Sequence, residues 1–410
     1  MQTETMRQRP LRILAADDSA VMRGVMRALF LRHGADGRGA ELPGMELVGA
    51  ARDGVECLDA VQRLKPDVLV LDLEMPQLSG LEVLDRLRTS RSMLPVIMCS
   101  SHTERGARAT LDALARGASD YVMKPAGQRD FESALFSLAQ QLLPRIAALA
   151  AGRRENMIAV RSAAPASTAV QERRSDASHE RRAPLEVVVI GVSTGGPAAL
   201  EQLLPRLSED FPVPVLIVQH MPKLFTGVLA ERLGRICPLR VEEAYHGAQI
   251  RPGTIWLAPG DAHMEVMPQA LSNWDAVRPA RGAAIKLHWQ EPLHHCRPAV
   301  DYLFHSAARL YGAGSLALVL TGMGSDGLDG ARAIHAQGGV VLAQDEATSA
   351  VWGMPGRVAE SGIAAATLPL QALAREVNQW VRTGRPARET EALRVTNHAR
   401  TRGEVAHGLF

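Results

Sequence analysis

The stretch LEVVVIGVSTGG, residues 185–196, is an apolar run that ends in a turn rich in glycine. An apolar run of this length is typical of a strand buried on both faces of a parallel sheet. Similar runs with polar or glycine-rich ends recur in VPVLIVQHM, GTIWLAPG, LALVLTGMG and GGVVLAQD. The repetition predicts a doubly wound, Rossmann-like α/β domain over residues 185–383.

A separate set of alternating segments lies nearer the amino terminus. The strand-like runs are RILAAD, MELVGAA, DVLVLDL, PVIMCSS and SDYVMKP, with helix-like segments between them. They predict a second parallel-sheet domain over residues 10–150, of the flavodoxin-like type. Residues 151–184 are rich in Ala, Ser, Arg and Glu and predict a flexible linker. Residues 384–410 lack sustained periodicity and predict a flexible tail.

Length, net charge and the distribution of apolar residues exclude several classes of protein. A chain of 410 residues, 46% of them hydrophobic, is too long for one ordinary core. A formal net charge of +2, spread along the chain, does not indicate a nucleic-acid surface. The amino terminus does not have the form of a signal peptide, and no uninterrupted apolar run reaches about 20 residues. We therefore expect a cytoplasmic protein with no membrane insertion and no nucleic-acid partner.

Polar residues follow the predicted strands of the first domain. Asp17 and Asp18 follow the first strand, Asp72 ends VLVLD, Ser100 ends VIMCS and Lys124 lies in YVMKP. The carboxyl ends of parallel strands form the binding crevice of an open sheet. Three carboxylates gathered there repel one another, and a hard cation such as Mg²⁺ would offset that repulsion.

This constellation, over about residues 10–145, resembles the receiver domain of two-component response regulators. The resemblance implies that Asp72 accepts a phosphoryl group from a sensor histidine kinase and that Lys124 contacts this group. It also implies that Ser100 and Tyr121 are the switch residues. The implied Mg²⁺ ligands are three carboxylates and one backbone carbonyl, those of Asp17, Asp18, Asp72 and Glu74. The segment FLRHGADGRGAELPGMEL before the second strand is longer than the family pattern.

In the second domain, Ser193 occupies the third position of a GxSxG pattern. A serine on such a turn can expose its hydroxyl as a nucleophile, although in this position it is more often a helix N-cap. A nucleophilic serine needs a base within hydrogen-bond reach and a third group that orients the base. His220 ends VLIVQH and Asp326 follows LALVL. Three residues at three strand ends make a Ser-His-Asp triad plausible.

Two other classes of function compete with a hydrolase. GMGSDG, with Asp345 after the next strand, approaches a dinucleotide fingerprint, but Asp326 would place a carboxylate inside the loop meant for pyrophosphate. A response regulator with a non-catalytic binding output would need a compact basic reader, whereas the second half is strand-rich and near neutral. Neither CxxC nor HExxH is present, so we expect no cofactor in this domain.

Longer strings of the second half are more specific than GxSxG. They are IGVSTGGP, VQHMPKLFTGVLAERL, IRPGTIWLAPGDAHMEV, RPAVDYLF, TGMGSDGLDG and QDEATSAVWGMPG. Together, over about residues 185–374, they resemble the protein-glutamate methylesterase domain of the chemotaxis response regulators, the CheB type. Cys296 is a departure, since many relatives carry histidine at its position.

The resemblance implies a role for each site residue. Ser193 would be the nucleophile, His220 the general base and acid, and Asp326 the residue that orients the imidazole. The backbone amide of Met323 would contribute to the oxyanion hole, and Thr194 would support the turn.

The resemblance also implies the reaction and its control. The enzyme would remove methyl esters from glutamate side chains of chemoreceptors through an acyl-enzyme, and some family members also deamidate receptor glutamines. The unphosphorylated receiver would cover the catalytic crevice, and phosphorylation of Asp72 would uncover it.

Overall fold

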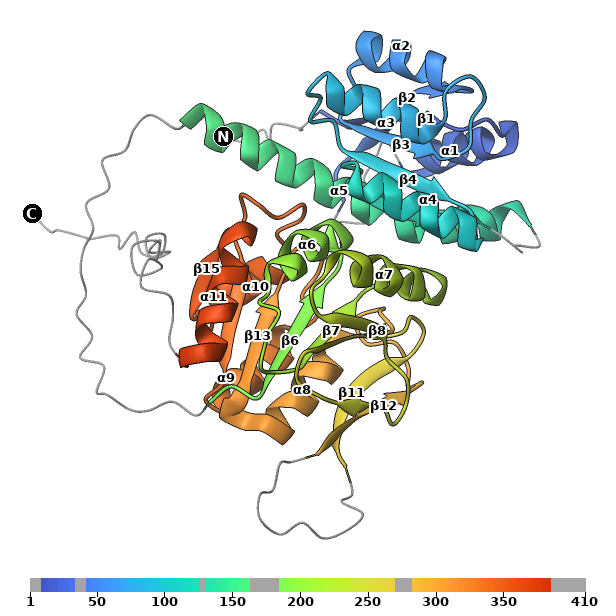
Figure 1. Cartoon of the computed structure of the whole chain (residues 1–410). Helices are drawn as coiled ribbons and strands as arrows, with labels where there is room; N and C mark the ends of the chain where they lie inside the picture. Colours follow the sequence, from blue (N-terminus) through green and yellow to red (C-terminus); the bar gives the residue numbers. More distant parts are fainter. Residues whose placement is uncertain (1–8, 34–41, 126–129, 163–183, 270–281, 385–410) are drawn as a thin grey trace, which may run out of the picture.

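The computed structural model describes residues 9–33, 42–125, 130–162, 184–269 and 282–384. Two parallel sheets with flanking helices dominate it, and Figure 1 shows the amino-terminal sheet and its helices lying over the second unit. The expected α/β class with two doubly wound sheets is confirmed.

The first sheet has the strand order β2-β1-β3-β4-β5, the flavodoxin-like order, and all its pairs are parallel. Its strands are β1 (Leu11–Ala16), β2 (Met45–Ala51), β3 (Val68–Asp72), β4 (Val96–Ser100) and β5 (Asp120–Met123). The helices are α1 (Ala20–His33), α2 (Gly54–Leu64), α3 (Gly80–Thr89), α4 (Glu104–Ala115) and α5 (Phe131–Ser162). Ser79 and Glu82 start α3 with a capping box.

Helix α5 runs to Ser162, beyond the expected domain boundary at residue 150. Ala, Arg, Glu and Met in ALAAGRRENMIAV are good helix formers, so the helix continues into the stretch expected to be linker. The rest of that linker, residues 163–183, lies outside the described residues, as do most of the lengthened segment after α1 and the tail from residue 385.

One stretch of α5, Phe131–Ala151, is long and apolar enough to cross a membrane. Its apolar side chains Leu135, Leu138, Leu142 and Ile146 are buried in the core of the first unit. This packing accounts for the composition, because a helix buried in a core needs the same apolar residues.

The second sheet has the order β15-β14-β13-β6-β7-β10-β8, again all parallel. Its strands are β6 (Val187–Val192), β7 (Val215–Gln219), β8 (Arg240–Glu243), β10 (Thr254–Leu257), β13 (Ser315–Val319), β14 (Val340–Gln344) and β15 (Ala366–Leu368). The helices are α6 (Gly196–Leu203), α7 (Lys223–Ile236), α8 (Val300–Tyr311), α9 (Leu328–Ala336), α10 (Met354–Glu360) and α11 (Leu370–Thr383). The chain winds outward from β6 in one direction and then returns to continue from β13, so the switch point lies between these neighbours.

A small antiparallel sheet of order β11-β12-β9 completes the second unit. Its strands are β9 (Gln249–Ile250), β11 (His263–Pro268) and β12 (Ala283–His288). From sequence alone, the stretch MPQALSNWDAVRPARGAAIKLHW is compatible with either a hairpin or a loop. The register of β11 with β12 shows a hairpin, whose connecting residues 270–281 lie outside the described part of the chain.

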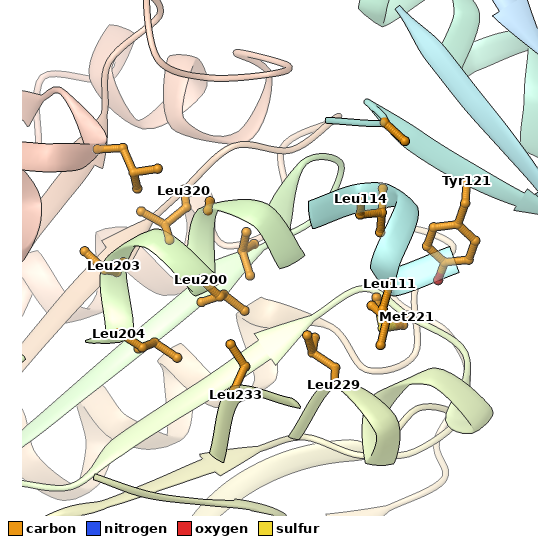
Figure 2. Packing of buried hydrophobic residues seen from close by; sticks show 14 of the residues in the cluster. Leu111, Leu114, Tyr121, Leu200, Leu203, Leu204, Met221, Leu229, Leu233 and Leu320 are labelled. Atoms are coloured by element: carbon orange, nitrogen blue, oxygen red, sulfur yellow. The ribbon is translucent and has the colours of Figure 1, made fainter. Parts of the chain in front are cut away.

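The two units share one apolar cluster. Leu111 and Leu114 of α4, with Tyr121 of β5, belong to the same buried cluster as Leu200 of α6 and Leu229 of α7. Figure 2 shows these side chains packed between the units. Burial of this apolar surface stabilises a closed arrangement in which α4 lies against α6 and α7.

Candidate active site and phosphoacceptor site

Ser193 follows β6 at the switch point of the second sheet. Its amide donates to the Thr321 carbonyl at 3.0 Å, and its carbonyl accepts from the Gly196 amide at 2.8 Å. Helix α6 is capped by Gly195, with a φ of 78°, and has no side-chain cap. The N-cap interpretation of Ser193 is therefore wrong, and its hydroxyl makes no hydrogen bond to any described residue.

His220 follows β7, the strand next to β6, and pairs with Asp326. The His220 Nε2 lies 2.8 Å from the Asp326 Oδ2, and their side chains are 10% and 2% exposed. Val192 and Gln219 are paired in the ladder of β6 and β7, so Ser193 and His220 leave neighbouring strands at the same level. The Gln219 amide group donates to the carbonyls of both residues, at 3.0 and 3.2 Å, and ties the two strand ends together.

Asp326 is held by the first turn of α8 as well as by His220. The amides of Val300 and Asp301 donate to its two carboxylate oxygens at 2.7 and 3.0 Å. Burial alone would raise the pKa of Asp326, but the His220 and backbone hydrogen bonds lower it below its ordinary value. Asp326 is therefore a carboxylate at neutral pH, and it occupies the loop that a dinucleotide fingerprint would need for pyrophosphate.

The proton affinity of His220 follows from these neighbours. Burial favours the neutral ring, yet the hydrogen bond with Asp326 and the nearby Cys296 oppose burial and raise the pKa of His220 above its ordinary value. The His220 Nε2 faces Asp326, the Cys296 thiol is the other side chain that interacts with the ring, and no hydrogen bond joins the ring to the Ser193 hydroxyl among the described residues.

Glycine makes room for the serine. A Cβ on Gly322 would lie 2.7 Å from the Ser193 Cβ and 2.5 Å from the Met354 Sδ. Gly322→Ala is therefore expected to displace the Ser193 turn and to lower any hydrolytic activity that depends on Ser193 at least about tenfold. Gly24→Ala, which meets nothing within 4 Å on α1, is the control. A Gly322→Ala enzyme with wild-type activity and melting temperature would contradict this account of the turn.

Thr194 follows the serine in the chain, and Met323 follows Gly322, which packs against the serine. The Thr194 hydroxyl donates to the Asp120 Oδ2 of the first unit at 2.7 Å, and its carbonyl accepts from the Thr321 hydroxyl at 2.9 Å. The Met323 side chain is exposed, and its backbone amide donates no hydrogen bond among the described ranges. A free amide beside Gly322 is available to a ligand; the structure alone leaves its role in an oxyanion hole a prediction.

The acidic residues of the first unit come together as expected. The Lys124 Nζ lies 3.0 Å from the Asp17 Oδ2 and 2.7 Å from the Asp72 Oδ2. Carboxylate oxygens of Asp17, Asp18 and Asp72 lie within 4.8 Å of one another. Burial raises the pKa of Asp72 to about 6, with Lys124 opposing and Asp17 and Asp18 adding to the rise.

A divalent cation fits this donor set. The Asp17 Oδ2 is buried and makes no hydrogen bond, although it lies near the Lys124 ammonium. A buried carboxylate oxygen that shares a single ammonium with Asp72, beside a third carboxylate, is an environment that a hard, oxygen-preferring cation stabilises. Glu74 lies two residues beyond Asp72, and the part played by its carbonyl stays a prediction.

Ser100 and Tyr121, the expected switch residues, are both buried. The Ser100 hydroxyl accepts from the Thr110 hydroxyl at 2.7 Å. The Tyr121 ring stacks on Phe225 of α7, with centroids 4.7 Å apart. The contacts of Thr110 and Phe225 with these two residues could not be predicted from the sequence. Each contact joins two segments, and the strand pattern does not specify how those segments pack.

Comparison with known proteins identifies the family. Residues 188–377 match the CheB methylesterase family, and residues 13–136 match the response regulator receiver domain. A protein-glutamate methylesterase/protein-glutamine glutaminase of Trichodesmium erythraeum (strain IMS101) is 43% identical over 366 residues, 89% of this chain and 97% of that protein. The chain belongs to the CheB methylesterase family.

A second curated relative and one solved structure are also similar to the chain. A protein of the same name from Nocardioides sp. (strain ATCC BAA-499 / JS614) is 44% identical over 381 residues, covering 92% of this chain and 97% of that protein. The crystal structure of the Thermotoga maritima CheB methylesterase catalytic domain is 38% identical, covers 48% of this chain and 100% of that chain, and has a TM-score of 0.45. The expected enzyme class, a methylesterase joined to a receiver domain, is confirmed by the family matches and the curated relatives.

Proposed function

We propose that Ser193, His220 and Asp326 hydrolyse the methyl esters of glutamate side chains on chemoreceptors. The observation that carries this proposal is the buried pair of His220 and Asp326, 2.8 Å apart, beside a serine whose hydroxyl has no structural task. A serine hydroxyl becomes a useful nucleophile only when a correctly oriented base takes its proton.

The reaction proceeds in two acyl transfers. His220 takes the hydroxyl proton at Nδ1 as Ser193 Oγ attacks the ester carbonyl carbon, and the Met323 amide donates to the oxyanion. Collapse of the intermediate breaks the bond to the methoxy group, which leaves as methanol with the proton from His220. Water, deprotonated by His220, then attacks the acyl-enzyme and releases the glutamate. Deamidation of glutamine would follow the same course with ammonia as the leaving group.

Labelling tests the nucleophile. Phenylmethylsulfonyl fluoride, applied to the full chain after activation by a small phosphodonor and Mg²⁺, should sulfonylate Ser193, as located by peptide mass spectrometry. Asp326→Asn should slow this labelling, because an unoriented imidazole is a poor base. Labelling of another serine at the same rate, with Ser193 unmodified, would contradict the assignment.

We further propose that phosphorylation of Asp72 controls access to the serine. Asp17, Asp18 and Asp72 would hold Mg²⁺, which when bound neutralises the carboxylates and the incoming phosphoryl charge. A cytoplasmic histidine kinase would be the phosphodonor. Contacts such as Thr194 with Asp120 and Tyr121 with Phe225 support this proposal, because they join the residue after the nucleophile and a switch residue to the opposite unit.

Removing an ion pair between the units tests whether the first unit restricts access to Ser193. Arg232 of α7 pairs with Asp112 of α4, and Arg232→Ala is expected to raise methanol release without phosphodonor about two- to fivefold. Arg332→Ala is the control, since among the described residues Arg332 pairs with Asp329 of its own helix, α9. Equal basal rates in Arg232→Ala and wild type would show that this ion pair plays no part in regulation by the first unit.

A further inference from the structure

A second histidine–carboxylate pair lies directly behind the first. The His294 Nε2 lies 3.1 Å from the Asp301 Oδ2, and ligand atoms of His294, Asp301 and Asp326 lie within 4.8 Å of one another. We propose that His294 and Asp301 are positioning residues, which hold Asp326 in place and set the proton affinity of His220. This inference rests on the proposed function of the triad.

Asp301 joins the two helices that support Asp326. Its amide donates to the Asp326 Oδ1 at 3.0 Å, and its own Oδ1 accepts from the Gly330 amide of α9 at 2.7 Å. A Cβ on Gly330 would lie 2.4 Å from the Phe304 Cβ, so α8 and α9 are in close contact here. The Asp301 carboxylate therefore fixes the first turn of α8, whose amides hold Asp326.

Two buried carboxylates side by side need compensation. Asp301 and Asp326 are each 2% exposed. Burial and the charge of Asp326 raise the pKa of Asp301, while the Gly330 amide and His294 oppose the rise. The ring N–H of His294 thus helps to keep Asp301 ionised. An ionised Asp301 adds negative charge next to Asp326, and this charge stabilises the imidazolium form of His220.

The turn that presents His294 is built at a conformational cost. The amides and carbonyls of Leu293 and Cys296 exchange two hydrogen bonds, at 3.1 and 2.9 Å. The central residues His294 and His295 have φ values of 52° and 60°, the region that favours glycine or asparagine. His295 is exposed and makes no hydrogen bond or ion pair with a described residue, whereas His294 makes a hydrogen bond with Asp301. Because His294 and His295 share the same turn and the same backbone region, alanine at His295 is the matched control for alanine at His294.

Among the described residues, a thiol and a further histidine also lie near the triad. Cys296, from the same loop, interacts with His220. His263, at the start of β11, accepts from the Ala299 amide at its Nδ1 and is held neutral, with its pKa lowered mainly by burial. Asp301, from α8, is therefore the neighbour whose charge His220 should sense through Asp326.

The titration of His220 tests the proposal independently of catalysis. In the full chain carrying Ser193→Ala, with isotope-labelled histidine, NMR reads the pKa of the His220 ring. Adding Asp301→Asn should lower it by about one unit, because one negative charge near the imidazolium is lost. An unchanged His220 titration in a folded Asp301→Asn protein would overturn the proposal.

Kinetics with Ser193 intact give the second readout. His294→Ala should lower kcat about tenfold with KM within about twofold, since only the orientation of the base is affected. His294→Gln, whose side-chain amide can still donate to Asp301, should recover most of kcat, and His295→Ala should match wild type. Equal losses in His294→Ala and His295→Ala would show a turn effect only and overturn the proposal. Shifted titration without any Ser193-dependent hydrolysis would instead count against the proposed function.

Discussion

Replacing Ser193 by alanine should lower ester hydrolysis by at least about 10⁴-fold while leaving the fold intact. The hydroxyl takes no part in capping α6 and makes no hydrogen bond to the described residues, so its loss removes only the nucleophile. We therefore expect a melting temperature equal to that of wild type. Initial rates of methanol release from a methylated receptor, with circular dichroism on the same samples, measure both quantities.

Ser325→Ala is the matched control for this substitution. Ser325 lies one residue before Asp326 in the same glycine-rich turn and is partly buried. Its hydroxyl has no assigned part in the reaction, so this variant should keep most of the wild-type rate. A Ser193→Ala enzyme that retained a tenth of the wild-type rate would show that Ser193 is not the nucleophile.

Asp326→Asn should lower hydrolysis by about 10³- to 10⁴-fold. The carboxylate accepts from three donors, the ring of His220 and the amides of Val300 and Asp301. An amide has one oxygen, so its NH₂ group must face either the α8 amides or the imidazole. The first arrangement weakens the start of α8, and the second stabilises the wrong tautomer of His220.

Asp329→Asn tests whether the loss is specific to the buried carboxylate. Asp329 lies in the first turn of α9, is exposed and pairs with Arg332. We expect this variant to keep the wild-type rate and to change stability by less than about 0.5 kcal/mol. Similar rate losses in Asp326→Asn and Asp329→Asn would mean that charge around α9, and not the hydrogen bond to His220, governs activity.

Much of the site could be predicted from which residues follow the strands in the sequence. Ser193, His220 and Asp326 follow β6, β7 and β13, which are neighbours in the sheet, and Asp17, Asp72 and Lys124 meet at the end of the first sheet. Parallel strands place their carboxyl ends at one edge, so residue order alone predicts these meetings.

Contacts that depend on packing between elements could not be predicted in this way. The bond of Thr194 to Asp120 joins residues 74 positions apart on two sheets, and no periodicity specifies how two sheets dock. His294 reaches Asp301 only because two consecutive non-glycine residues adopt positive φ, which local preference disfavours. Helix α5 extends beyond its expected boundary because Ala, Arg and Glu, which are common in linkers, also have high helix propensity.

Methanol release from methylated receptor membranes tests the central claim most directly. Wild type, Ser193→Ala and Asp72→Ala would be compared with and without a small phosphodonor and Mg²⁺. We predict that the phosphodonor accelerates wild type, that Asp72→Ala keeps a basal rate that does not respond, and that Ser193→Ala releases no methanol above background in either condition. Release from Ser193→Ala at the wild-type rate would contradict the account.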